Sequence, residues 1–299
     1  MVFADEKFEI NALQKLETMS QAMKQLDYHG TVAFFKNGRL DTMKYFHSSI
    51  QGQERERLMS LNSPMREVIR ELGAVRCVFK KTNKTVLNKH PVSDSFIIDL
   101  PKDFPAIQSS YSFVSLDEES VAMLPAYVIS IEPKDQYRYK RKVWIDKVSF
   151  LPLKTEVYNV LGATVEQVVF TDIFVEKRVI VTDNLAEKMK IETLQSEILS
   201  AEKTNVVIGD LPLNYYVKFF TQMDGNNVDN PVEHTLLSDG FSSVSVYVEK
   251  NTGDTAEGLQ IIGSVKSLTK LIDNHQITVL GEVPVETVQF IAQGIKLKK

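Results

Sequence analysis

Hydrophobic residues recur every three or four positions near the start of the chain. Between Lys7 and Tyr28 the stripe is uninterrupted by Gly or Pro and consists of Phe8, Ile10, Leu13, Leu16, Met19, Met23 and Leu26. Such spacing is typical of an amphipathic helix with one buried face. We therefore predict a helix over residues 7–28 that ends at His29-Gly30.

From Thr31 onward the pattern changes to short runs rich in β-branched and aromatic residues. The runs 31–35 and 40–46 are joined through Asn37-Gly38, a dipeptide that favours a tight hairpin turn. Long helices are missing between the runs, which favours an antiparallel meander over a doubly wound parallel sheet. The stretch 104–120 is less regular, and we predict loop with a helical turn or two there. Further strands are predicted at 58–61, 67–72, 75–79, 85–87, 126–131, 137–146, 153–158 and 164–174.

A helix followed by such a meander suggests a strongly curved sheet or open barrel around the helix. Residues 183–203 are then rich in Glu, Lys, Ser and Thr, and we predict a linker there. Strands resume after it, and a proline opens a closing helix over 284–294. Because 299 residues are many for one core, we predict a mainly β (α+β) fold in two domains, 1–182 and 204–299. Strands of the second domain are predicted at 206–208, 215–220, 236–237, 244–248, 260–267 and 277–280.

Composition and motifs narrow the function. The net charge is −4, so bulk charge gives no argument for nucleic acid, and no run of about 18 apolar residues predicts a membrane span. The one cysteine, Cys77, lies in an apolar strand pattern and is predicted to be a buried, inert thiol. Common catalytic and nucleotide-binding motifs are absent, and the five histidines are too far apart for a helical metal-ligand pair. We expect that the protein is not an enzyme and binds neither a cofactor nor a metal. A metal site or an active site assembled from residues distant in sequence is the alternative.

Large apolar side chains lie on successive predicted strands of the first domain. If they face the concave side of the sheet, they line a pocket for acyl chains, since ligand sites are concave and mostly apolar. The other reading is an ordinary packed core, and a one-residue error in register would exchange the faces of a strand. The candidates are Phe34, Met43, Tyr45, Tyr127, Ile129, Trp144 and Phe170.

A basic cluster interleaved with Tyr137 and Tyr139 offers contacts for phosphate groups. A lipid head group and single-stranded nucleic acid both fit this chemistry. The overall acidity argues against nucleic acid, and the plain alternative is a strand with one solvated, charged face. The candidate head-group residues are Arg138, Lys140, Arg141 and Lys142.

Several stretches, in order along nearly the whole chain, resemble the RseB/MucB family of periplasmic regulators of the sigma-E envelope-stress pathway. A Ser-Asp-Gly turn feeds a Ser/Val strand in Leu237–Glu249, with Gly281-Glu-Val-Pro284 some forty residues later. Within the long run from Arg55 to Arg70, Ser63 stands where the family has glycine. The other matching stretches are Leu26-Asp-Tyr-His-Gly-Thr31, Leu151-Pro-Leu153, Leu161–Gln167 and Thr287–Ala292.

The resemblance implies a large LolA/LolB-like domain, an unclosed antiparallel barrel with helices, and a small domain with an antiparallel sheet and a helix. It also implies binding to the periplasmic region of the anti-sigma factor RseA (MucA), which would shield that factor from the site-1 protease DegS. Lipopolysaccharide, or its lipid part, would release the regulator from the anti-sigma factor. The implied location is the periplasm, and Val2-Phe-Ala4 fits the small-residue rule for a signal-peptidase site.

Residues that contact the partner are harder to assign. We name Arg66, Arg70, Asp239, Gly240 and Phe241 as candidates, with a hairpin turn and ordinary surface charges as the alternative reading. Three other functions compete with the regulator: a lipid or lipoprotein carrier in the same fold, an enzyme with a dispersed site, and a structural envelope protein. Self-association into a homo-oligomer stays open.

Overall fold

The computed structural model describes residues 2–62, 66–79, 84–176, 190–193, 196–223, 231–253 and 256–298. The chain divides into two compact units that are interleaved along the sequence. The first unit contains Met1–Ile98, Ser112–Glu132 and Lys140–Leu194, and the second contains Asp99–Tyr111, Pro133–Tyr139 and Gln195–Lys299. The chain therefore passes between the units five times, after residues 98, 111, 132, 139 and 194.

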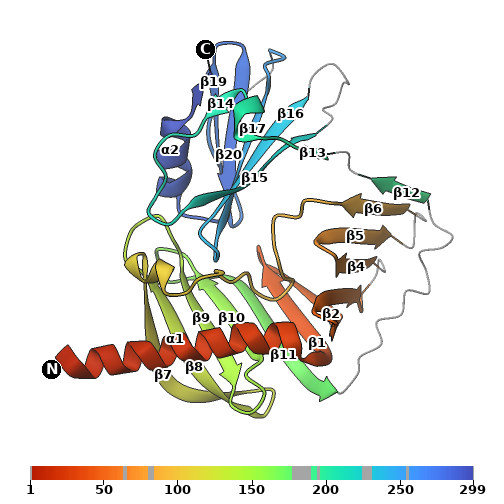
Figure 1. Ribbon diagram of the computed structural model, residues 1–299, viewed down its shortest axis with the longest axis vertical. Coiled ribbons are helices and arrows are strands. Elements are labelled where there is room, and N and C mark those ends of the chain that lie inside the picture. The colour runs from red at the N-terminus through yellow and green to blue at the C-terminus, as the bar shows by residue number, and fades with distance from the viewer. Residues whose placement is uncertain are drawn as a thin grey trace. The chain divides into compact units, whose positions relative to one another are not determined.

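A twelve-stranded sheet forms the framework of the first unit (Figure 1). Its described pairings are antiparallel apart from that of β12 with β6. Among the described residues the two edge strands, β12 and β7, do not pair with each other, so the sheet is unclosed, as predicted. In spatial order the strands are β12 (Lys190–Thr193), β6 (Lys84–Asn88), β5 (Ala74–Phe79), β4 (Arg66–Glu71), β3 (Gln53–Ser60), β2 (Arg39–Ile50), β1 (Asp27–Lys36), β11 (Thr164–Glu176), β10 (Pro152–Tyr158), β9 (Lys140–Asp146), β8 (Leu124–Pro133) and β7 (Tyr111–Val121).

The predicted N-terminal helix is confirmed as α1 (Val2–Gln25), which runs across one face of this sheet (Figure 1). Its buried stripe includes Leu16 and Met19, and the ammonium group of Lys15 lies 4.2 Å from the ring centroid of Tyr127 on β8. The helix ends three residues before the predicted end, because Tyr28 already belongs to β1. Gly30 follows in that strand, where a Cβ atom would lie 2.2 Å from the carbonyl oxygen of Asp172.

Two predictions about strands are wrong. In the stretch 104–120 the predicted helical turn is confirmed as the short 3₁₀ helix Ala106–Ser109, but the predicted loop after it is most of the strand β7. Most of β7 beyond residue 113 is exposed, so its polar and acidic residues hid a strand at the sheet edge. The run 260–267 is not one strand but a hairpin, because Gly263 takes a positive φ of 61° between β18 (Gly258–Ile262) and β19 (Val265–Ile272).

The second unit contains a seven-stranded sheet with the helix α2 (Val285–Gly294), which begins after Pro284 as predicted. A separate two-stranded ladder pairs β14 (Val206–Val207) with β21 (Lys296–Leu297), and a 3₁₀ helix spans Ala201–Lys203. The sheet contains, in order, β13 (Ser196–Ile198), β15 (Tyr216–Met223), β16 (Val232–Ser238), β17 (Ser243–Lys250), β20 (His275–Gly281), β19 and β18.

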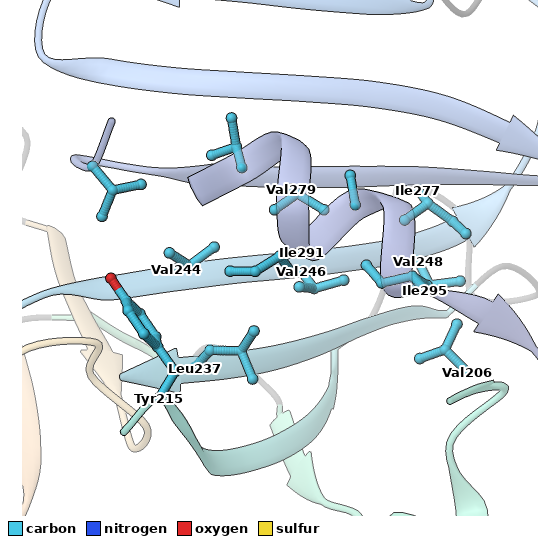
Figure 2. Close-up of a cluster of buried hydrophobic side chains, with 13 residues drawn as sticks. Val206, Tyr215, Leu237, Val244, Val246, Val248, Ile277, Val279, Ile291 and Ile295 are labelled. Atoms are coloured by element: carbon cyan, nitrogen blue, oxygen red, sulfur yellow. The ribbon is translucent and has the colours of Figure 1, made fainter. Parts of the chain in front are cut away.

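Apolar side chains alternate with polar ones along the central strands of this sheet, and the apolar face forms an aliphatic core. Val244, Val246 and Val248 of β17 point to the same face, since side chains two residues apart share a face of a strand. Figure 2 shows them together with Val279 of β20 and Ile291 of α2. All five are buried, so the helix and the sheet close the core between them.

The predicted linker is only partly described. Residues 177–189 and 194–195 lie outside the described residues. Between them, β12 lies beside β6 in the sheet of the first unit. After them, β13 lies beside β15 in the sheet of the second unit. Parts of the segment 183–203 are therefore strands within the two sheets.

Candidate functional site

Strand register places six of the seven apolar candidates on one face of the large sheet. Ile129 lies opposite Val143, and the same row continues through Thr155 and Val168 to Phe34. A second row joins Phe170, Val32 and Met43, and Tyr45 follows Met43 by two residues. Cross-strand partners share a face of a sheet, and Tyr127 is two residues from Ile129. The helix α1 covers this face, because Lys15 contacts Tyr127.

Trp144 does not belong to this set. It lies opposite Val128 of β8, a neighbour of Ile129, so its indole is on the other face of the sheet. The indole N–H donates to Glu119 at 2.8 Å, and Lys154 lies 4.3 Å from its ring. Of the other six candidates, Met43, Tyr45, Ile129 and Phe170 are buried and Phe34 and Tyr127 are half-buried.

A buried polar cluster lies among the aromatic rings of the helix-covered face. The Tyr45 ring meets the Phe170 ring edge-on at 5.8 Å, and its hydroxyl donates to Glu56 at 2.8 Å. Burial, and then the charge of Glu56, raises the pKa of Tyr45 well above its ordinary value. Arg70 completes the cluster by donating from Nε to the other oxygen of Glu56 at 2.8 Å. Arg70 is only 8% exposed, so this candidate partner contact is engaged inside its own unit.

The carboxylate of Glu56 also holds an extended segment against the sheet. The hydroxyl of Ser95 donates to it at 2.9 Å, and the backbone N–H of Phe96 lies 3.2 and 3.3 Å from its two oxygens. Arg70 donates to the carbonyl of Ser93 at 2.6 Å, and its guanidinium lies 4.6 Å from the Phe96 ring. Ile97, next in the chain, is buried. One ion pair therefore fixes the path of residues 93–97.

The four candidate head-group residues occupy three different environments. Lys140 and Lys142 alternate with Arg141 along β9 and so lie on the Trp144 face. Lys140 pairs there with Glu132 at 2.6 Å. Arg141 lies opposite Ile131 and Val157, and so on the helix-covered face.

Arg138 belongs to the second unit and is 2% exposed. Its Nε donates to Asp239 at 2.7 Å, and it also bonds Asp135 and the carbonyl of Leu213. Burial, the largest single influence, lowers the pKa of the guanidinium, but Asp239 together with Tyr111, Tyr215 and Asp135 more than offsets it, so the pKa is raised. Because its donors are all directed inward, Arg138 serves the packing of its own unit.

Asp239 joins three separate parts of the second unit. One carboxylate oxygen accepts the N–H groups of Phe241 and Ser242 and so fixes the turn after β16. The other accepts the hydroxyl of Tyr111 at 2.7 Å as well as Arg138. Burial, and then the charge of Asp239, raises the pKa of Tyr111 well above its ordinary value. Asp239 is 1% exposed, so this side chain contacts its own chain.

The neighbours of Asp239 are equally enclosed. Gly240 has a positive φ of 96°, and a Cβ there would lie 2.5 Å from the Cα of Pro101. Phe241 packs edge-on against Tyr111 at 5.3 Å and Phe104 at 6.3 Å. Of the five candidate partner contacts, Arg66 is the exposed one, and it faces Asp41 at 3.4 Å. The turn therefore holds residues 101–111 within the second unit.

Sequence reasoning missed Glu56 and Tyr111, which carry these two clusters. Glu56 lies in a charged run, Glu54-Arg-Glu-Arg57, that reads as a solvated strand. One signal was available in the sequence. Glu56 lies just before the predicted strand 58–61 and Arg70 lies in the next predicted strand, and opposite charges on neighbouring antiparallel strands can form a cross-strand pair. Tyr111 was hidden because 104–120 was predicted to be loop.

The described ranges contain neither a cluster of metal ligands nor a helix that could span a membrane. No group of three His, Cys, Asp or Glu side chains in that part of the chain is arranged to hold a metal ion. Nor is any helix among these residues both long and apolar enough to cross a bilayer. Cys77 is half-buried rather than buried, and burial raises the pKa of its thiol.

Comparison with known families matches the chain in two consecutive parts. Residues 11–197 match the model of the MucB/RseB N-terminal domain, and residues 214–296 match that of the MucB/RseB C-terminal domain. Sigma-E factor regulatory protein RseB of Haemophilus influenzae is 24% identical over 97% of this chain and 92% of its own length. Sigma factor AlgU regulatory protein MucB of Pseudomonas aeruginosa is 26% identical over 94% of this chain and 89% of its own.

Solved structures agree on the fold over nearly the whole length. MucB in the complex structure of Pseudomonas aeruginosa MucA/MucB is 24% identical, with a TM-score of 0.76, and the match covers 97% of this chain and 99% of that one. A crystal structure of MucB is 23% identical, with a TM-score of 0.69, and the match covers 97% of this chain and 98% of that one. The fold described above is therefore similar to that of MucB.

Proposed function

Because the chain belongs to the MucB/RseB family, we propose that it regulates a sigma-E envelope-stress response by binding the periplasmic region of an anti-sigma factor of the RseA/MucA kind. The observation that carries this proposal is the match of both family domains, in order, across the described chain. Relatives of similar length are named sigma-E factor regulatory proteins, and MucB has been solved with the periplasmic part of MucA. The role is that of a binding protein of the periplasm, not an enzyme.

The finer steps of the proposal follow from linked binding. Bound to the anti-sigma factor, the protein would shield it from the site-1 protease DegS, and lipopolysaccharide would release it. A ligand weakens partner binding only as far as it binds the partner-free form more tightly than the complex. We assign lipid binding to the large domain, 1–182, and partner binding chiefly to the small domain, 204–299.

The helix-covered face supports an acyl-chain site. It gathers six large apolar side chains in adjacent rows, of which Phe34 and Tyr127 are half-buried. Arg141 is the candidate head-group residue that shares this face. Apolar side chains with one well-placed cation fit an amphipathic lipid with an anionic head group.

Neighbouring residues on opposite faces give matched tests of this site. Phe34→Ser should weaken binding of lipopolysaccharide about ten-fold, whereas Phe35→Ser, on the other face of the same strand and also half-buried, should not. Arg141→Gln and Lys142→Gln form a second pair, with the loss expected for Arg141→Gln. Isothermal titration with purified lipopolysaccharide measures both pairs. Equal losses within each pair would assign the lipid to another surface.

The central experiment is a titration of the full chain with the periplasmic segment of its anti-sigma factor, with and without lipopolysaccharide. Tight binding that lipid weakens supports the regulator, and protection of the segment from purified DegS supports the shielding step. Lipid binding without partner binding would favour a lipid or lipoprotein carrier instead. Sedimentation velocity on the same samples measures self-association.

A further inference from the structure

Residues 93–111, which we name the strap, form one continuous segment that is anchored in both units. Its first part, up to Ile98, belongs to the first unit, and its second part, from Asp99, belongs to the second. Glu56 holds the first part through Ser95 and Phe96. The strap is buried at intervals along its length, at Ile97, Ile98, Pro101, Phe104, Ile107, Ser110 and Tyr111.

The second part of the strap is anchored just as firmly. Asp239 accepts the hydroxyl of Tyr111, Gly240 adjoins Pro101, and Phe241 packs against Phe104. These three residues of one turn therefore contact the strap at its start, middle and end within the second unit. Asp239 is 1% exposed, so water cannot replace a hydrogen bond that its carboxylate loses. Breaking this anchor therefore costs free energy.

Very little chain separates the two anchors. Phe96 is held in the first unit, Pro101 is held in the second, and only residues 97–100 lie between them. Five residue steps span at most about 18 Å when fully extended, and Ile97 and Ile98 are themselves buried. The two anchors are therefore joined by a covalent connection of only four residues.

We propose that the strap transmits rearrangement of the helix-covered face in the first unit to the Ser238–Ser242 turn of the second. The Glu56–Arg70 pair is the anchor at the sending end, and Asp239 is the anchor at the receiving end. Tyr45, which lies in the rows of the apolar face, donates directly to Glu56, so a change among these rings reaches the strap through one hydrogen bond. Use of this transmission to release a partner rests on the proposed function, but the coupling of the two anchors does not.

Hydrogen exchange of the full chain, without ligand, tests the coupling itself. Glu56→Gln removes the charge that holds Phe96, and exchange of the Phe96 and Ile97 amides should rise about ten-fold. The inference requires a rise of at least three-fold at the amides of Phe241 and Ser242 as well, which Asp239 holds in the other unit. A rise confined to residues 93–98 would overturn it.

A matched control separates transmission from general loss of stability. Glu67 is 2% exposed and pairs with Arg57 on the other face of the same sheet, away from the Glu56–Arg70 pair that holds the strap. Glu67→Gln should leave exchange of the Phe241 and Ser242 amides unchanged. An equal rise in both variants would also overturn the inference. If Glu56→Gln does not fold, Ser95→Ala removes one donor to Glu56 and should give a smaller rise at the same two places.

The reciprocal variant and one titration complete the test. Asp239→Asn should raise exchange at Phe96 as well as at its own turn. In the titration with anti-sigma segment and lipopolysaccharide, Glu56→Gln should reduce the factor by which lipid weakens partner binding. If the wild-type chain shows no such factor, the proposed function fails, while the exchange data still decide whether the strap couples its anchors.

Discussion

The two units bury different kinds of side chain beneath a helix. In the second unit, α2 and the sheet enclose a core of Val, Ile, Leu and Ala with one tyrosine, Tyr215. In the first, the face covered by α1 includes Tyr45 bonded to Glu56, and Glu56 bonded to Arg70, beside the ring of Phe170. Apolar contacts are non-directional, whereas a buried polar cluster is stable only when each member finds its partner. The aliphatic core of the second unit therefore contributes mainly to stability. The polar cluster of the first unit contributes mainly to fixing one arrangement of its side chains.

A likeness between the units sharpens this difference. Among the described residues, each unit contains a carboxylate–guanidinium pair in which both residues are buried: Glu56 with Arg70, and Asp239 with Arg138. Both carboxylates also accept a tyrosine hydroxyl and a backbone N–H. Both thus fix a stretch of irregular backbone rather than add to an aliphatic core. The difference between the cores predicts distinct responses to substitution, as follows.

The largest effect is expected in the polar cluster. Glu56→Ala leaves Arg70 buried without its partner and should lower the free energy of unfolding of the first unit by about 3–5 kcal/mol. Urea unfolding followed by circular dichroism measures it. The double variant Glu56→Leu with Arg70→Met should recover most of this loss, since no unpaired charge remains. A loss below about 1 kcal/mol for Glu56→Ala would show that the pair contributes little to stability.

The aliphatic core should respond through volume alone. Ile291→Ala opens a cavity between α2 and the sheet and should cost about 2–5 kcal/mol in the second unit. Ile261→Ala is the control in the same unit, because that side chain is 59% exposed and should cost no more than about 0.5 kcal/mol. Thermal unfolding of both variants separates them. Similar losses would mean that the core lies elsewhere.

One buried histidine should make the second unit sensitive to acid. His234 stacks on Tyr247 at 4.5 Å and lies 3.0 Å from the hydroxyl of Ser245, and burial lowers the pKa of its imidazole to about 4. Below about pH 6.5 the imidazole is protonated in the unfolded chain but stays neutral in the folded unit. The free energy of unfolding therefore decreases as the pH falls.

Between pH 6.5 and pH 5 the loss from this imidazole should be about 1.5 kcal/mol. Urea unfolding at the two pH values, compared between wild type and His234→Gln, isolates its share from that of the carboxylates. The variant should lose less stability than wild type over the same interval. Parallel losses would show that His234 does not set the acid response.

The smallest effect is expected at the end of α2. Lys270 of β19 donates to the carbonyl of Ala292 in the last turn of α2 and to that of Ile295 just after the helix, and burial lowers the pKa of its ammonium group. A cation there stabilises the helix, so Lys270→Gln should cost about 0.3–1 kcal/mol. Lys266→Gln, on the same strand, should cost less because Lys266 bonds a turn carbonyl instead. Thermal unfolding again suffices, and a larger loss for Lys266→Gln would contradict the assignment.

Secondary-structure elements were predicted well where a single local sequence preference determines the backbone conformation. Asn37-Gly38 forms the expected hairpin turn, with φ of 53° and 73°, because both residues tolerate left-handed backbone. The spacing of α1 predicted its buried stripe but not its end, since Tyr28 continues the apolar pattern as a strand residue beside His47. Gly263 was missed as a turn because the residues on both sides of it form strands.

The site was predicted less well because it depends on register and on distant contacts. Residue types identified the apolar candidates, but only the pairing of Trp144 with Val128 shows that this indole faces away from them. Arg138 looked like its basic neighbours in sequence, yet its partner Asp239 is 101 residues away. No local pattern contains such a pairing. Family resemblance supplied the proposed function, which composition and motif searches had left open.

Interleaving of the two units has a consequence for the order in which the protein folds during synthesis. Tyr111 leaves the ribosome 128 residues before Asp239, and Arg138 leaves it 101 residues before. At about 5–20 residues per second, roughly 5–25 seconds pass before their shared partner exists. Until Asp239 and Phe241 are available, Phe104, Tyr111 and the Arg138 guanidinium lack the turn that buries them, so the second unit cannot close before most of the chain has been made.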